Sequence, residues 1–69
     1  MDISKKIKKL LVEKGFTATQ LAKEIGISQP YVSKKMANND WSINDLEKIA
    51  KALDVEFEAN FILKDGEKI

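Results

Sequence analysis

The chain has 69 residues, with 12 lysines against 11 acidic residues and a net charge of +1. It contains neither cysteine nor histidine, which removes disulfides, the usual zinc ligands, and the commonest catalytic nucleophile and base. Its longest apolar runs are three residues, far shorter than a membrane span or a signal peptide requires. We therefore expect one small cytoplasmic domain, not an enzyme, without metal or cofactor, whose core a second subunit can extend.

Charge is distributed unevenly along the chain. Residues 1–35 contain eight lysines and three acids, a net charge of +5, whereas residues 36–69 contain four lysines and eight acids, a net charge of −4. A basic first half indicates a polyanionic partner, with a solvated helix face as the alternative. No arginine is present, so the bidentate arginine–guanine contact, the commonest specific contact in the major groove, is excluded.

Four helices are predicted in the first four-fifths of the chain. Their expected ranges are about 2–14, 18–25, 29–37 and 43–53. Each of the last three follows a hydroxyl side chain that can cap its first turn, with apolar residues on both sides in the staple positions. These caps are Thr17, Ser28 and Ser42.

The second and third predicted helices are separated only by residues 26–28. So short a connection makes a sharp bend, which is typical of a helix-turn-helix motif. Three residues support this interpretation. Ala22 is small where the two helices approach, Gly26 supplies a positive φ in the turn, and Val32 points into the core.

After Asp54 the hydrophobic period changes from 3.6 to 2, which predicts a strand. Its apolar face is expected to form a dimer interface through Val55, Phe57, Ala59, Phe61 and Leu63. A lone strand leaves its backbone groups unpaired, and only three residues follow the Asp65–Gly66 turn. We therefore expect antiparallel pairing with the same strand of a second copy, and divide the chain into a helix-turn-helix domain, 1–54, and a dimerisation segment, 55–69.

Several segments match a known pattern: Leu21-Ala22, Gly26-Ile27-Ser28-Gln29, Val32-Ser33-Lys34 and residues 46–53. In these residues the chain resembles the lambda-repressor-like, Xre/Cro-type helix-turn-helix family of transcriptional regulators. The resemblance covers about residues 2–55. It implies a mostly α fold, a four-helix DNA-binding domain with its motif at about 18–37, to which the C-terminal β-strand is an addition. It also implies that the third helix lies in the major groove of double-stranded DNA.

The resemblance and the exposed side of the third helix suggest the same contacts. Bases are expected to be contacted by Gln29, Pro30, Ser33 and Lys34. A glutamine can bond adenine bidentately, an apolar ring can touch a thymine methyl, and a lysine can reach guanine. DNA phosphates are expected to be contacted by Thr17, Thr19, Lys35, Asn38 and Asn39.

Three residues depart from the family's pattern. The family commonly has glutamine in place of Ala18, an apolar residue in place of Lys35, and glycine in place of Asp54. The first change removes one side-chain phosphate clamp. The third puts a residue with a Cβ where the backbone favours glycine.

The leading functional hypothesis is a sequence-specific DNA-binding transcriptional regulator, a bacterial or phage dimeric repressor with a near-palindromic operator. Two alternatives stay open. The first is an antitoxin that binds both DNA and a toxin protein. The second is a protein-interaction module that has kept the fold and lost DNA binding.

Overall fold

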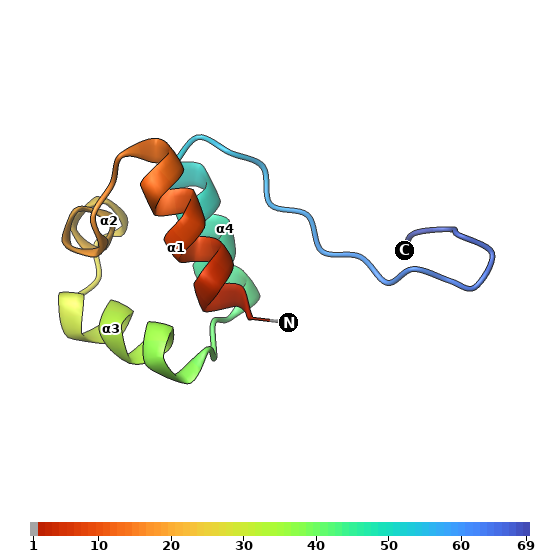
Figure 1. Ribbon diagram of the computed structural model, residues 1–69, viewed down its shortest axis with the longest axis horizontal. Coiled ribbons are helices and arrows are strands. Elements are labelled where there is room, and N and C mark those ends of the chain that lie inside the picture. Colours follow the sequence, from red (N-terminus) through yellow and green to blue (C-terminus); the bar gives the residue numbers. More distant parts are fainter. Residues whose placement is uncertain (1) are drawn as a thin grey trace.

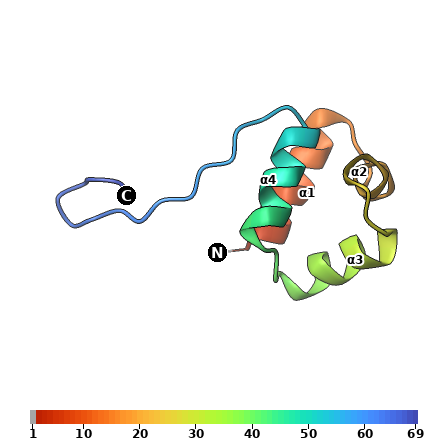
Figure 2. The same ribbon diagram turned by 180° about the vertical axis from the view of Figure 1, so that it is seen from behind.

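The computed structural model describes residues 2–69, which form a helical body followed by an extended arm (Figure 1). The body contains four helices: α1 (Ile3–Lys14), α2 (Ala18–Ile25), α3 (Gln29–Asn38) and α4 (Ile43–Ala52). Helices α1 and α4 lie side by side, while α3 lies at the far end of the body from the α1–α2 turn (Figures 1 and 2). All four predicted helices are confirmed, with ends that differ by one residue at most.

The predicted caps explain where the helices begin. The hydroxyl of Thr17 accepts from the backbone N–H of Gln20 at 3.1 Å, and the Gln20 side chain accepts from the Thr17 N–H at 2.8 Å. The same reciprocal pair joins Ser42 and Asp45, at 3.0 and 3.1 Å. Ser28 caps α3 through its hydroxyl. These bonds satisfy backbone donors that a helix leaves free in its first turn.

The turns after α1 and α2 are equally well determined by local chemistry. Gly15 and Gly26 end these helices with φ of 69° and 74°, a left-handed conformation that glycine adopts without strain. The next residues, Phe16 and Ile27, donate to carbonyl oxygens of the preceding helix at 2.9 and 3.0 Å. Each of them also lies directly before the N-cap of the following helix. One apolar residue therefore closes one helix and determines how the chain enters the next.

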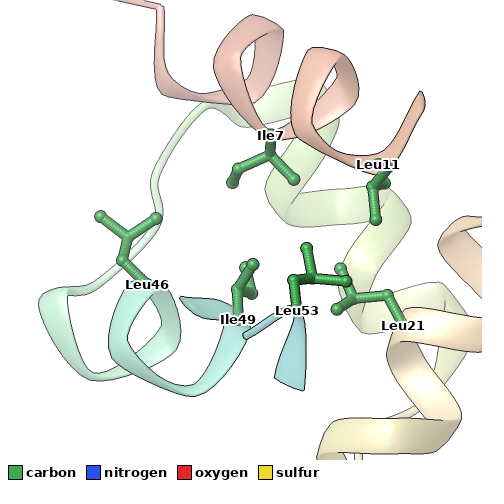
Figure 3. Close-up of a cluster of buried hydrophobic side chains, with 6 residues drawn as sticks. All are labelled: Ile7, Leu11, Leu21, Leu46, Ile49 and Leu53. Carbon is green, nitrogen blue, oxygen red and sulfur yellow. The ribbon is translucent and has the colours of Figure 1, made fainter. Parts of the chain in front are cut away.

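The core lies between α1, α2 and α4 (Figure 3). Its buried cluster consists of Ile7, Leu11, Leu21, Leu46, Ile49 and Leu53. Trp41 and Met36 pack against this cluster from the α3 side. Helix α3 contributes a single fully buried side chain, Val32.

The turn that follows α4 contains a residue with a strained backbone. Asp54 has a φ of 55°, in the left-handed region that costs a residue with a Cβ more than glycine. The N–H of Val55 then donates to the carbonyl of Ala50 at 2.9 Å, and the Val55 side chain packs against the core. The position where the family commonly has glycine therefore requires a positive φ here too.

The predicted strand of residues 55–63 is not confirmed in the single chain. Among the described residues, 2–69, no extended strand is formed, and residues 56–60 make no backbone hydrogen bond. A single antiparallel bridge pairs Ile62 with Lys68. The physical reason is that a strand needs a partner for its N–H and C=O groups, and one chain offers almost none.

The last residues supply a little more pairing than the sequence suggests. The backbone groups of Phe61 and Ile69 exchange two hydrogen bonds, of 2.7 and 2.8 Å. The N–H of Leu63 donates to the carbonyl of Glu67 at 2.7 Å, across a turn at Asp65–Gly66. This small hairpin closes the tip of the arm and leaves its stem unpaired (Figure 1).

The apolar face expected along the strand is only partly covered by the helices. Val55 is partly buried, and Phe57 borders an apolar groove between α1 and α4. Ala59, Phe61 and Leu63 are exposed. The arm extends away from the body before these residues are reached, so the four helices leave them exposed (Figure 2).

Candidate nucleic-acid interface

Helices α2 and α3 form the predicted helix-turn-helix unit. The three residues predicted to shape it behave as expected: Ala22 and Val32 are buried, and Gly26 has a positive φ. The turn leaves α3 at the edge of the body, with one side toward α2 and the other toward solvent (Figure 1). A helix presented in this way can enter a DNA groove.

The four residues predicted to contact bases lie on one solvent-exposed side of α3. Gln29, Pro30, Ser33 and Lys34 are all exposed. The Gln29 amide donates to the Ser33 hydroxyl at 3.3 Å, across one helical turn. Both polar side chains therefore share a face, and only an exposed hydrogen bond must break when Gln29 meets a base.

The residues predicted to contact phosphate occupy two places around this face. Thr17 and Thr19 are exposed at the N-terminus of α2, where backbone N–H groups and the helix dipole favour an anion. Asn38 and Asn39 are exposed where α3 ends. The side-chain oxygen of Asn39 accepts a hydrogen bond from the Ser4 N–H at 2.9 Å.

Lys35 differs from the other predicted phosphate contacts. Its side chain is only 22% exposed. The ammonium group donates to the carbonyl of Asp40 at 3.2 Å and lies 3.9 Å from the Asp40 carboxylate. It also lies 5.3 Å from the centre of the Tyr31 ring, within the range of a cation–π interaction. The structure therefore gives Lys35 partners within the protein.

Sequence reasoning missed a contact between α3 and α4. The Tyr31 hydroxyl donates to the Asp45 carboxylate, with its oxygen 3.2 and 3.3 Å from the two carboxylate oxygens. Asp45 is buried. The capping pattern predicts that Asp45 bonds Ser42, but nothing in the sequence indicates a tyrosine fourteen residues earlier as a second donor.

The charge state of Asp45 follows from these contacts. Burial alone raises the pKa of this carboxyl group. Hydrogen bonds from the backbone and side chain of Ser42, the hydrogen bond from Tyr31, and the positive charge of Lys35 outweigh that effect and lower the pKa below its ordinary value of 3.8. Asp45 is therefore an ionised acceptor at neutral pH.

A second missed contact joins α3 to α1. Ser4 is buried on α1, and its hydroxyl accepts from the Trp41 indole N–H at 3.0 Å and lies 3.5 Å from the Lys35 carbonyl. With the Ser4–Asn39 bond, these contacts attach the C-terminal end of α3 to the first turn of α1. The sequence offers one sign of these contacts: Ser4 shares the apolar face of α1 with Ile7 and Leu11.

A comparison with protein-family models shows which family the chain resembles. The model described as Cro/C1-type HTH DNA-binding domain matches residues 6–58. No curated protein and no solved structure matches the chain. None of the helices in residues 2–69 is long and apolar enough to cross a membrane. Since the match covers most of the chain and includes the whole helix-turn-helix unit, the chain belongs to the Cro/C1-type HTH DNA-binding domain family.

Proposed function

We propose that this DNA-binding protein is a dimeric repressor that places α3 in the major groove of a near-palindromic operator. One observation is central: the exposed side of α3 presents an amide, a rigid apolar ring, a hydroxyl and an ammonium group together. These are Gln29, Pro30, Ser33 and Lys34. Such groups distinguish base pairs in the major groove, where each pair presents its own donors, acceptors or methyl group.

Contacts to the DNA backbone set the register of this helix. In the proposed complex α2 crosses the sugar–phosphate backbone, so that Thr17 and Thr19 meet one phosphate at the positive end of α2. The Thr17 oxygen already accepts from Gln20, but its hydroxyl hydrogen remains able to donate to a phosphate oxygen. Asn38 and Asn39 contact a phosphate at the other end of α3.

The dimer is proposed from the arm. The stem at residues 56–60 has unpaired backbone groups, and Phe61 is 79% exposed. A second copy of the same segment, antiparallel across a two-fold axis, supplies both missing partners. An axis at Asn60 or at Ala59 suits this pairing, whereas an axis at Glu58 sets like charges opposite each other.

The dimer also explains the proposed operator and mode of action. Two α3 helices related by a two-fold axis contact half-sites about 34–36 Å apart, which requires a near-palindromic sequence. A protein that occupies such a site can block transcription without further activity. Repression is therefore the simplest use of this arrangement.

Selection of bound sequences from a random DNA pool, followed by mobility-shift measurements, tests the base contacts. We expect Gln29→Ala to relax the preference at one adenine in each half-site, because a lost bidentate pair is worth roughly 1–3 kcal/mol of discrimination. Lys51→Ala, which removes an exposed lysine from α4, is the matched control and should keep the preference. An unchanged preference in Gln29→Ala would refute the proposed docking of α3.

The salt dependence of binding tests the phosphate contacts. If the dimer neutralises about six phosphates, the logarithm of the binding constant should fall with the logarithm of salt concentration at a slope near −5. Failure to bind any duplex at low salt would exclude the proposed function altogether.

Light scattering tests the dimer. Phe61→Glu should leave a folded monomer, because the Phe61 side chain is largely exposed in the described part of the chain. Val12 on α1 is as exposed, at 82%, so Val12→Glu is the control and should leave the dimer intact. A wild-type chain that stays monomeric at tens of micromolar would contradict the dimer and leave the arm free for another protein.

A further inference from the structure

Base contacts require α3 to be held at a defined rotation and tilt, and its apolar contacts restrain these two angles only weakly. Within this helix of ten residues only Val32 is fully buried. Val32 and the partly buried Met36 hold one side of the helix to the rest of the body, but these two contacts restrain its tilt less than attachment at both ends does. Base contacts depend on those angles, because hydrogen bonds to base edges weaken steeply when donors and acceptors are misaligned.

Polar contacts at the two ends of α3 supply the missing restraint. Near the N-terminus, Tyr31 bonds Asp45 on α4. At the C-terminus, Asn39 bonds the backbone of Ser4 on α1. The two residues are eight positions apart, about 12 Å along a helix axis. Attachment at these two separated points adds to the contacts of Val32 and Met36 and restrains the direction of the helix.

Asp45 is a rigid anchor for the first of these contacts. One of its oxygens accepts from the Ser42 N–H at 3.1 Å as part of the cap of α4. Asp45 is buried and ionised, so the partly buried bond from the Tyr31 hydroxyl is charge-assisted. The Asp45 carboxylate is fixed at the start of α4, so its bond with Tyr31 fixes the position of α3 relative to α4.

Lys35 completes the contact. It lies one helical turn after Tyr31, with its ammonium group over the Tyr31 ring and bonded to the Asp40 carbonyl. Its charge also acts on Asp45. These interactions restrain the Tyr31 ring and direct the lysine toward the α3–α4 loop.

We propose that Tyr31, Asp45 and Lys35 form a latch that holds α3 at the angle needed to discriminate between DNA sequences. Lys35 acts within this latch and neutralises no phosphate. The proposal rests on the proposed function, since it concerns the same α3 face. None of the three is a base contact; they are positioning residues that act through Gln29 and its neighbours.

The latch separates specific from nonspecific binding. Contacts to phosphate are long-range and tolerate small rotations of α3, whereas contacts to base edges do not. Loss of the latch should therefore reduce the ratio of affinities for the selected sequence and for random duplex. A role limited to fold stability would lower both affinities together and leave the ratio unchanged.

The experiment measures both affinities at several salt concentrations, first for the wild type and then for Tyr31→Phe, Lys35→Met and Lys34→Met. Circular dichroism is used to check that each variant is folded. We expect Tyr31→Phe, which removes one hydroxyl, to lower the affinity ratio about 3–10-fold, the value of one hydrogen bond. Its nonspecific affinity and salt slope should match the wild type.

The two lysine variants form a matched pair on adjacent residues. If Lys34 meets phosphate, Lys34→Met should reduce the magnitude of the salt slope by about 0.9 for each phosphate that the protein no longer neutralises. If Lys34 meets a base, the same variant should change one base preference. Lys35→Met should leave the salt slope unchanged and lower the affinity ratio. This readout is independent of any effect of Tyr31→Phe on folding.

Three outcomes overturn the latch. An unchanged ratio in folded Tyr31→Phe removes the role of the hydroxyl, and an equal loss of both affinities reduces it to stability. A salt slope lowered by Lys35→Met makes Lys35 a phosphate contact. Failure of the proposed function is distinguishable, because the wild type itself would then prefer no sequence, which overturns both proposals.

Discussion

The helical body and the C-terminal arm solve the problem of backbone hydrogen bonding in different ways. In α1 to α4 the backbone bonds run between residues one turn apart, and the caps Asp2, Thr17, Ser28 and Ser42 each satisfy one donor left free at a helix start. The arm has equally clear periodicity, yet residues 56–60 make no backbone hydrogen bond within the described chain. A helix is completed by local sequence, whereas a strand is completed by a partner.

The side chains repeat this difference. Leu21 is completely buried among residues of three helices, while Phe61, the same class of residue, is almost fully exposed. The stability of the body is therefore a property of one chain. The state of the arm depends on what lies next to it, and so on protein concentration.

The largest effect is expected where the body is most completely packed. Leu21→Ala should destabilise the protein by about 2–5 kcal/mol, because it removes buried methyl groups and leaves a cavity. Urea denaturation measures the change. Phe61→Ala, measured at a concentration where the chain is monomeric, is the control and should change stability by less than about 0.5 kcal/mol. Comparable losses in the two variants would show that the arm packs against the body in solution.

The next effect concerns the start of α4. Asp45→Asn should cost about 1–2 kcal/mol at neutral pH, the usual value of a helix cap. The pKa of Asp45 is lowered in the folded protein, so its ionised form stabilises the fold. That contribution is complete above the pKa of the unfolded chain, about 3.9, and is lost as the pH falls through the lower pKa of the folded state. The advantage of the wild type over Asp45→Asn should therefore shrink below about pH 4, and a constant difference down to pH 2.5 would contradict the ionised anchor.

A smaller effect, of opposite sign, is expected where the body meets the arm. Asp54→Gly should stabilise the protein by about 0.5–1 kcal/mol, because glycine accepts the left-handed conformation more readily. Asn39 has nearly the same φ, 53°, but its side chain also bonds Ser4. Asn39→Gly is thus a matched control that relieves the same strain and loses a bond, and thermal melting should show no gain. Equal stabilisation by both variants would mean that the Asn39–Ser4 bond contributes nothing.

The sequence predicts most of the helical body but few of the hydrogen bonds between its helices. Thr17 with Gln20, or Ser42 with Asp45, identifies a helix start because both partners lie within four residues. The exposed face of α3 follows from helical periodicity once Val32 is assigned to the core. The Tyr31–Asp45 bond and the Ser4–Asn39 bond depend on how helices cross, which no local pattern specifies. The period of 2 after Asp54 predicts a strand, but the described single chain shows only one bridge there, because pairing requires a partner that the pattern does not contain.

Removal of the arm is expected to have the smallest effect on the stability of the helical body, and it tests directly whether the two regions are independent. A chain that ends at residue 58 keeps Phe57, which borders the groove between α1 and α4, and loses the exposed part of the arm. Under dilute conditions its stability should lie within about 0.5 kcal/mol of the full chain, because the removed residues make few contacts with the helices.

Concentration should then separate the two chains. If the arm pairs across a dimer, folding is coupled to association, and the Tm of the full chain should rise with protein concentration. The shortened chain has lost Phe61 and its paired hairpin, so its Tm should stay constant over the same range. A full chain whose Tm is equally insensitive would show that the arm finds no second copy. In that case the alternation of apolar residues after Asp54 must serve a different partner, and the two regions of this protein would differ in function as well as in structure.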